Sequence, residues 1–348
     1  MTIPGDILDG RGAADELLAY VLGAPLAKVL DLSTPAGFDR AVTALAARLR
    51  AVAAGDERRA VREAIAVLDV DWPRTTAAER RQLVAEAMRR AGHHIRAVPS
   101  RLDAPLGDAA MEVVSATRTV SRRHHRLAIG IEMNALDRRI VRHVTRSQAL
   151  FVTDAYGRRL EELGVRAKEI VAAGLEAGHT RTEIAEALAA AAEGALTGRS
   201  RFYWEVVAGA FVGRARSFAQ VSSYAEAGVE RYRVQAVLDE ATTLVCRFLH
   251  GKVFTVRASL AGFDRVERLS DPDDVKRASP WVRQKGGVLF VEHATGRREL
   301  AGVVRSGSGV RDDVGEFHSR IDDAALEGLG IGPPPYHGLC RSTSVPIL

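Results

Sequence analysis

The chain has 348 residues, of which 47% are hydrophobic and 27% charged, with a formal net charge of +5, values ordinary for a globular protein. No apolar run approaches the roughly 20 residues that a membrane-spanning helix needs. The first residues lack the basic and apolar regions of a signal peptide. These features exclude a wholly disordered or membrane-spanning protein. We expect it to be made in the cytoplasm and used there, or packed into a particle assembled there.

Hydrophobic periodicity predicts that the first part of the chain is helical. Apolar residues recur every three or four positions over residues 13–31 and again over residues 37–54, as in helices that bury one face. A third helix is predicted to follow Pro73, to be capped by Thr75 or Thr76, and to end near Ala91. Strand-like alternation is scarce here. We therefore expect an all-α N-terminal region.

Two breaks are predicted along this helical region. Turn-like residues from Pro99 to Leu106 predict a break near 97–106 that divides it into two sub-blocks, with long helices over residues 107–175. Thr180 and Glu183 form a capping box that starts a further helix, and the same pattern fits the turn of a DNA-reading helix-turn-helix. The stretch from Gly194 to Ser200 is the strongest break. We place a domain boundary there, with residues 1–198 as the helical region.

The remaining residues, 199–348, predict a small α+β domain. Residues 201–227 form an amphipathic helix with an aromatic-rich face, and residues 232–237, 252–256 and 288–291 have the composition of short strands. Residues 257–287 and 292–335 are rich in Gly, Pro and Asp and predict long loops. The fold class of the whole chain is therefore α+β. Long loops in a compact domain need something to hold them in place.

The cysteines could hold these loops. The chain has two, Cys246 and Cys340, and each has a histidine nearby, His250 and His337 respectively. Two sulfurs and two imidazoles complete a tetrahedral zinc site. Two plainer arrangements fit the same residues: reduced, buried thiols, or a disulfide formed after exposure outside a cell. We predict that Cys246, His337 and Cys340 meet in space, with His250 as the fourth member.

Both cysteines belong to longer motifs. The first motif contains Asp239, Thr242, Cys246 and Gly251 ahead of a short strand; the second is the Pro-rich segment that ends in His337-Gly338-Leu339-Cys340-Arg341. In order and position the two motifs resemble the C-terminal domain of the Mu-F-like minor head proteins of tailed phages. The preceding helix, which contains Arg214 and Arg216, is also similar in place to an Arg-containing helix of that family. The resemblance covers about residues 200–348.

The chain departs from the family pattern at several positions. Many relatives carry further cysteines in both motifs, where this chain has Phe248 or Leu249 and Ser342. His250 stands where an acidic residue is usual. Because these changes reduce the set of metal ligands, a packed Cys–His cluster without metal fits the sequence equally well.

The resemblance implies a structural, non-enzymatic role in the head of a phage, prophage or gene-transfer-agent particle. Proteins of this family join the portal vertex or head interior in a few copies and assist capsid assembly or DNA ejection. The portal protein is then the expected partner, together with the major capsid protein and double-stranded DNA, and no membrane is involved. Two other classes stay open: a metal-stabilised nucleic-acid-binding module, and a Cys–His enzyme or toxin-related protein with Cys246 or Cys340 as nucleophile. We find no phosphate-binding loop, dinucleotide fingerprint or His-Glu-x-x-His motif.

One stretch of the helical region is strongly basic. Between residues 118 and 146 the only acids are Glu132 and Asp137. A basic stretch of this kind fits a solvated helix face, and it also fits sequence-independent contact with DNA phosphates. The arginines predicted to make such contacts are Arg118, Arg122, Arg123, Arg126, Arg138, Arg139, Arg142 and Arg146.

Overall fold

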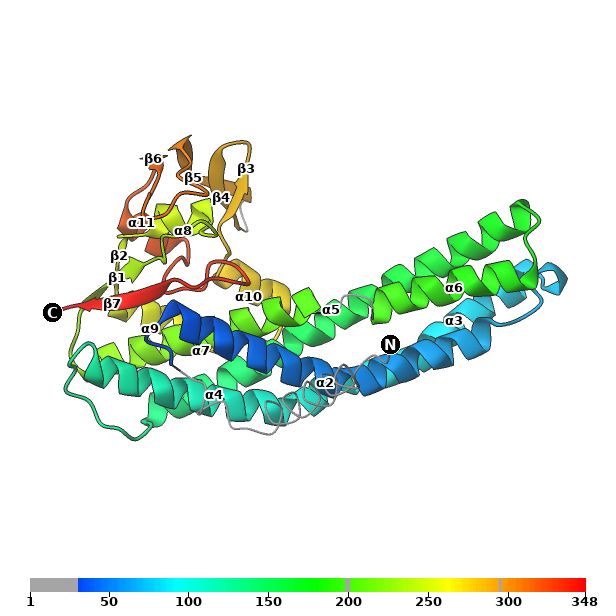
Figure 1. The fold of residues 1–348 in the computed structure, drawn as a ribbon, viewed down its shortest axis with the longest axis horizontal. Helices are drawn as coiled ribbons and strands as arrows, with labels where there is room; N and C mark the ends of the chain where they lie inside the picture. The colour runs from blue at the N-terminus through cyan, green and yellow to red at the C-terminus, as the bar shows by residue number, and fades with distance from the viewer. Residues whose placement is uncertain (1–30, 198–200, 294–295) are drawn as a thin grey trace, which may run out of the picture.

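The computed structural model describes residues 31–197, 201–293 and 296–348. They form an elongated bundle of long helices with two small antiparallel sheets on one end (Figure 1), which confirms the α+β class. The helix predicted over residues 13–31 lies outside the described residues, apart from its last position.

Within the described residues, six long helices build the bundle. Their bounds are α2 (Pro35–Leu68), α3 (Ala77–Ile95), α4 (Val98–Arg123), α5 (Ala135–Glu176), α6 (Arg181–Leu196) and α7 (Arg201–Glu226), with a short 3-10 turn at Trp72–Arg74. At 42 residues, α5 is about 63 Å long and packs against α3, α4, α6 and α7. The far ends of α2 and α5, with α3 and α6, form an arm that extends away from the sheets (Figure 1).

Capping residues define where several of these helices begin. Thr180 and Glu183 form the predicted capping box at α6. Thr76 caps α3, one of the two predicted caps, and forms a further capping box there with Glu79. The helix predicted over residues 37–54 exists but continues to Leu68 as part of α2.

The turn predicted from Pro99 to Leu106 is wrong. These residues lie in α4, and α3 is separated from α4 only by the two-residue turn of Arg96 and Ala97, whose backbone angles stay in the right-handed helical region. Pro99 occupies the first turn of α4, where an amide hydrogen has no helical partner to lose. Pro105 lies inside the helix, where flanking buried residues such as Leu102 and Leu106 outweigh the lost hydrogen bond.

Helix α7 connects the two halves of the molecule. Its first part, including Trp204 and Phe211, shares one hydrophobic core with α2, α4 and α5. Its last part, including Val221 and Tyr224, packs in a second core with the strands and both cysteines. The boundary at residues 198/199 therefore falls between two helices of one bundle, and as a division into separate domains it stays a prediction.

Two antiparallel sheets follow α7. The first has the strand order β2 (Val253–Thr255), β1 (Arg231–Gln235), β7 (Thr343–Ile347), and the second has the order β3 (Arg283–Lys285), β4 (Val288–His293), β5 (Gly296–Arg305), β6 (Glu316–Ser319). Strands β1, β2 and β4 confirm the three predicted strands.

The two predicted loop regions are largely structured. Residues 257–287 contain most of α9 (Val256–Glu267), all of α10 (Pro272–Ala278) and strand β3. Residues 292–335 contain β5, β6 and the short helix α11 (Asp323–Gly328). Gly, Pro and Asp mark the ends of these short elements here, as at α10, where Asp271 caps the helix and Pro272 begins it. Because these residues are also typical of loops, composition alone did not predict the short helices and strands.

Glycines on α7 allow the end of the chain to lie against this helix. A methyl group on Gly209 would lie 2.5 Å from the carbonyl oxygen of Gly338, and one on Gly213 would lie 3.2 Å from the Pro335 side chain. Gly338 is equally close-packed, since a methyl group there would lie 2.5 Å from the Val206 side chain. Any larger residue at Gly209 must push backbone away.

We expect Gly209→Ala to destabilise the protein by roughly 1–3 kcal/mol, because the added methyl overpacks against the backbone of residue 338. Gly157→Ala in α5 is the matched control. A methyl group at residue 157 meets nothing within 4 Å, so this change should stabilise the helix by roughly 0.5–1 kcal/mol. Urea unfolding of both variants measures the difference. Equal effects of the two changes would contradict the close approach of α7 and residue 338.

Candidate metal centre

Three metal-ligating side chains meet where the closing segment, residues 333–342, crosses the short helix α8 (Leu244–Leu249). The Sγ atoms of Cys246 and Cys340 lie 3.6 Å apart, and Nε2 of His337 lies 3.1 Å from the Cys246 Sγ. Their ligand atoms all lie within 4.8 Å of one another. The prediction that Cys246, His337 and Cys340 come together is confirmed.

The local backbone directs the ligand atoms of Cys246, His337 and Cys340 toward one another. Thr243 caps α8 and accepts the Cys246 amide hydrogen, so the Cys246 side chain leaves the first turn of the helix. His337 and Cys340 lie on one turn of the closing segment, in which the Cys340 amide donates to the His337 carbonyl oxygen.

The separation of the two sulfurs suits a tetrahedral ion. With metal–sulfur bonds of about 2.3 Å and metal–nitrogen bonds of about 2.0 Å, two ligand atoms of such an ion lie about 3.5–3.8 Å apart. The observed separation of the sulfurs, 3.6 Å, falls in this range and is far longer than a disulfide bond, whereas His337 Nε2 lies closer to the Cys246 Sγ than this, at 3.1 Å. Both cysteines are free thiols and buried. The described residues therefore contain a Cys–His–Cys group that could hold a metal ion.

The two thiols differ in their readiness to ionise. The hydrogen bond with Cys340 and burial raise the pKa of Cys246 well above its ordinary value. Burial also acts to raise the pKa of Cys340, but the hydrogen bond from Cys246 and the charge of His337 outweigh it and lower that pKa to about 5. A thiolate on either sulfur prepares this pair to bind a cation, because thiolate is the metal-binding form.

His250 does not join this group, so its prediction as the fourth ligand is wrong. It follows the last residue of α8 with φ −58° and ψ 130°, outside helical geometry. Its Nδ1 instead accepts a hydrogen bond of 3.2 Å from the Ala236 amide. Two hydroxyl groups lie closer to the cluster: Thr243 Oγ1 is 3.2 Å from His337 Nε2, and the buried Ser342 hydroxyl lies beside both sulfurs without a well-formed hydrogen bond.

The other motif residues join the same two segments. Nη2 of Arg341 donates to both carboxylate oxygens of Asp239, at 2.7 and 2.6 Å, in an ion pair. Thr242 accepts the Asp239 amide hydrogen at 3.0 Å, which holds the loop before α8 in shape. Gly251 has φ +81°, a conformation that favours glycine, and its amide donates to Val234 in β1. We call the Asp239–Arg341 pair and the Cys–His–Cys group together the clamp.

Residues of α7 that the sequence did not single out as contacts hold the closing segment from the other side. Arg216 donates to the carbonyl oxygens of Arg341 and Ser342, at 3.2 and 2.5 Å. The Gln220 side chain donates to Thr343 at 2.8 Å and accepts from the Ser344 hydroxyl at 2.8 Å, while Tyr224 donates to the Ser344 carbonyl oxygen. The only sequence signal was a pair of arginines, 214 and 216, within an apolar helix face.

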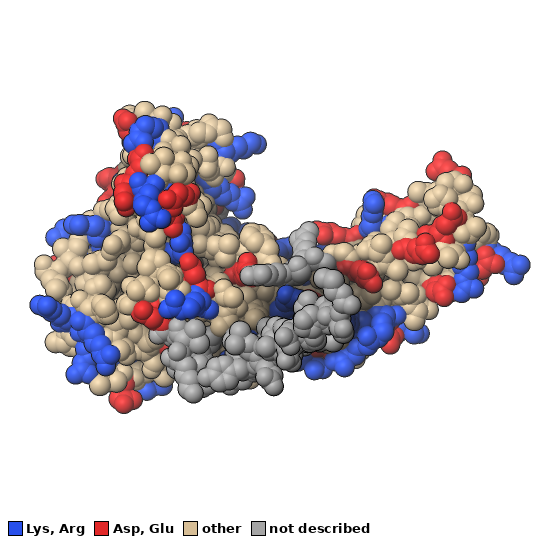
Figure 2. Space-filling view, viewed as in Figure 1, with Lys and Arg blue, Asp and Glu red and all other residues tan. Residues whose placement is uncertain are grey.

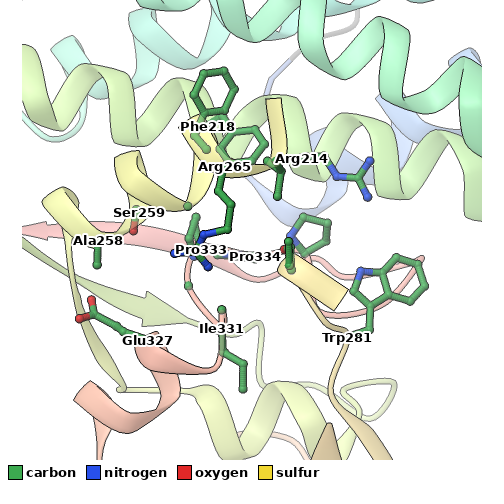
Figure 3. Close-up of a pocket in the computed structure, with 18 residues that line it drawn as sticks. Arg214, Phe218, Ala258, Ser259, Arg265, Trp281, Glu327, Ile331, Pro333 and Pro334 are labelled. Carbon is green, nitrogen blue, oxygen red and sulfur yellow. The ribbon is translucent and has the colours of Figure 1, made fainter. Parts of the chain in front are cut away.

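Beneath the closing segment lies a small cavity of about 70 Å³ between α7, α9 and residues 330–335 (Figure 3). Arg214 and Phe218 border it from α7, with Pro333, Pro334 and Trp281 nearby. Burial lowers the pKa of Arg214 to about 10, still above neutrality. Proline rings thus line this side of the closing segment, and they stiffen the turn that carries His337 and Cys340.

Half of the arginines predicted to contact DNA are engaged within the protein. Arg118 is 1% exposed and binds Asp137 and Glu226 at 2.7 and 2.9 Å. Arg139 pairs with Asp264 and Glu267 of α9, at 2.6 and 2.5 Å. Arg138 donates to the Met133 carbonyl oxygen at 2.8 Å, and Arg146 donates to that of Glu267. The prediction that Arg118 contacts DNA is wrong, because this side chain is buried and paired with two acids. One of these acids, Glu226, lies on α7 and outside the basic stretch.

The other four, Arg122, Arg123, Arg126 and Arg142, are exposed and make no ion pair with another described residue. Three of them lie where α4 ends and the chain turns toward α5. Figure 2 shows basic side chains gathered at this end of the molecule.

Among the described helices, none is long and apolar enough to cross a membrane. Comparison with family models, with curated proteins and with solved structures found no match to this chain.

We expect the clamp to bind one thiophilic divalent ion per chain, with Co²⁺ as an optical probe. Sulfur-to-metal absorption should appear in the full-length protein and be lost in Cys246→Ser and Cys340→Ser, because the thiolates supply it. His337→Ala should weaken binding. His250→Ala is the control and should bind normally, since His250 lies outside the cluster. Absorption that depends on His250 and not on His337 would reverse this assignment.

Proposed function

We propose that this chain is a minor head protein of a tailed-phage-type particle, whether phage, prophage or gene-transfer agent. One observation carries the proposal. The two motifs that resemble the Mu-F-like family lie about a hundred residues apart in sequence, yet they meet in one clamp through Asp239–Arg341 and Cys246–Cys340. A pair of motifs that acts as one structural unit is harder to match by chance than either motif alone.

In this proposal the clamp binds zinc and has a structural role. Zinc takes sulfur and imidazole ligands at tetrahedral positions, and Cys246, His337 and Cys340 supply three of them. A water molecule, or a hydroxyl of Thr243 or Ser342, takes the fourth. The ion ties the closing segment to α8 and so keeps β7 paired with β1 in the sheet.

The shape of the molecule supports a role in assembly. The arm and the sheet-bearing end are separate surfaces joined by the continuous helices α2 and α5 (Figure 1). We propose that the helical region docks on the portal protein and that the sheet-bearing end faces the head interior, in contact with packaged DNA and the major capsid protein. No catalytic step is part of this proposal.

We expect the full-length protein, tagged in its native genome, to be recovered in purified particles in far fewer copies than the major capsid protein and to cross-link to the portal. Cys246→Ser with Cys340→Ser should lower the amount per particle, because the loosened closing segment destabilises the sheet-bearing end. His250→Ala should be incorporated normally. Quantitative mass spectrometry of particles and lysate gives the ratio. If the protein were abundant in the lysate but absent from purified particles, the proposal would be contradicted.

A second activity, sequence-independent binding of duplex DNA, is favoured by the four exposed arginines Arg122, Arg123, Arg126 and Arg142. Arginine binds phosphate oxygens through paired N–H groups, and these side chains make no ion pair with another described residue. We propose this activity as part of the head protein's role, and as the main activity if the chain is a metal-stabilised nucleic-acid-binding module.

Replacing Arg122, Arg123 and Arg126 together by Ala should weaken binding to random duplex. The slope of log K against log salt should fall in magnitude by about 2–3, because each phosphate contact contributes about 0.9. The control removes the same charge from three exposed arginines elsewhere in the bundle: Arg62, Arg81 and Arg96. Equal losses in the two triple variants would show that net charge, and not this end of the molecule, governs binding.

A further inference from the structure

A second cavity lies in the middle of the helical bundle, away from the clamp. Its volume is about 270 Å³; it is lined by α2, α5, the end of α6 and the start of α7, and it opens to solvent beside the exposed side chains Arg50 and Arg58. The charged residues that line it are Arg50, Glu57 and Arg58 from α2 and Arg159 from α5; Thr197 also borders it, and the ring of Trp204 forms an apolar wall. This volume is many times what one water molecule needs.

Arg159 is the residue in this cavity that most needs a partner. It is 5% exposed, and its guanidinium packs on the faces of Tyr156 and Tyr203, at 5.1 and 4.2 Å from the ring centroids. It makes no hydrogen bond or ion pair with another described residue. A buried cation without an anion in contact is costly, because the aromatic faces replace only part of its hydration.

The charges around the cavity are unbalanced. Arg50 and Arg58 lie on the same face of α2 and likewise form no ion pair with a described residue. Among the described residues that line the cavity, Glu57 is the only acid, so three guanidinium groups lie around one carboxyl group. With all four ionised, the sum of +3 and −1 is +2. The cavity therefore favours an anion with two negative charges.

Glu57 restricts which anion fits. It is 8% exposed, and its Oε1 accepts the hydroxyl hydrogen of Tyr156, which leaves Oε2 without a donor among the described residues. An anion that carries its own O–H can donate to Oε2 while its other oxygens accept from the arginines. An anion without an O–H would place a bare oxygen against the carboxylate, and like charges in contact repel.

We propose that this cavity binds inorganic hydrogen phosphate, with Arg159, Arg50 and Arg58 as donors to its oxygens and Glu57 as acceptor of its proton. Near pH 8 inorganic phosphate has charge −2 and retains one O–H. Sulfate has the same charge and no O–H. A phosphate monoester has lost its O–H above its second pKa of about 6, and a phosphodiester such as the DNA backbone never has one. The site is independent of the clamp and of the proposed role in the head.

Calorimetric titration of the full-length protein at pH 8 and constant ionic strength tests the proposal. Phosphate should bind saturably, while sulfate, phenyl phosphate and dimethyl phosphate should each bind at least about tenfold more weakly, as expected when a buried acceptor loses its donor. Trp204 lines the cavity and provides a fluorescence signal for the same titrations.

Variants separate the two parts of the site. Arg50→Ala with Arg58→Ala should lower phosphate affinity about tenfold or more without affecting folding, since both side chains are exposed. Arg159→Gln should lower it further. Glu57→Gln should remove the preference over sulfate, because an amide can donate to a bare oxygen. Arg81→Ala, on α3, is the control and should bind as the unmodified protein does.

Three results would overturn the proposal. The first is no saturable binding of phosphate at millimolar concentration. The second is equal affinity for sulfate in the unmodified protein, which would remove the role of Glu57. The third is a loss in Arg81→Ala equal to that in the Arg50 and Arg58 variant, which would show a general effect of charge.

Discussion

Arg216 of α7 contacts the closing segment, and the position of the clamp and of strand β7 depends on this contact. Its guanidinium donates to the carbonyl oxygens of Arg341 and Ser342 and stacks over Phe38 of α2, 4.4 Å from the ring centroid. The bundle, the connecting helix and the closing segment thus meet at one side chain. From there β7 is directed onto β1, and the turn that carries His337 and Cys340 faces α8. If this side chain were shorter, the peptide groups at 341 and 342 would be buried without donors.

The clamp offsets the entropic cost of closing a long loop. Cys246 and Cys340 are 94 residues apart, and closing a flexible loop of that length costs about 4 kcal/mol or more. The Asp239–Arg341 pair offsets part of this cost, and burial of this ion pair strengthens it because solvent screens it less. The metal ion proposed for the clamp would add ligand bonds to this offset, because binding free energy at a site that forms only on folding contributes to folding. The strands are short and share their hydrophobic core with α7 and the closing segment, so a crosslink at the clamp would act on a core that the closing segment helps to complete.

Local signals in the sequence predicted what depends on local structure. The capping boxes at Thr76 and Thr180, the aromatic face of α7 and the strands β1, β2 and β4 follow from neighbouring residues alone. The meeting of Cys246, His337 and Cys340 could be predicted because each of the two motifs contains a cysteine with a histidine nearby. The orientation of His250 could not, since one residue of non-helical backbone turns it toward Ala236. The burial of Arg118 was equally hidden, because Glu226 approaches it from 108 residues away.

The distribution of arginine partners explains why this chain uses arginine where lysine would carry the same charge. Arg118 reaches two carboxylates and the Gly130 carbonyl, and Arg247 reaches the carbonyls of Asp239, Thr242 and Val310. A lysine ammonium is a single point and cannot reach acceptors this widely spread, whereas the planar guanidinium presents five N–H groups in fixed directions. Much of the basic composition is therefore used to connect segments inside the protein. Other described arginines make no ion pair within the protein, and two groups of these carry the proposals made above: those where α4 ends, for the phosphates of a duplex, and those around the central cavity, for a single anion.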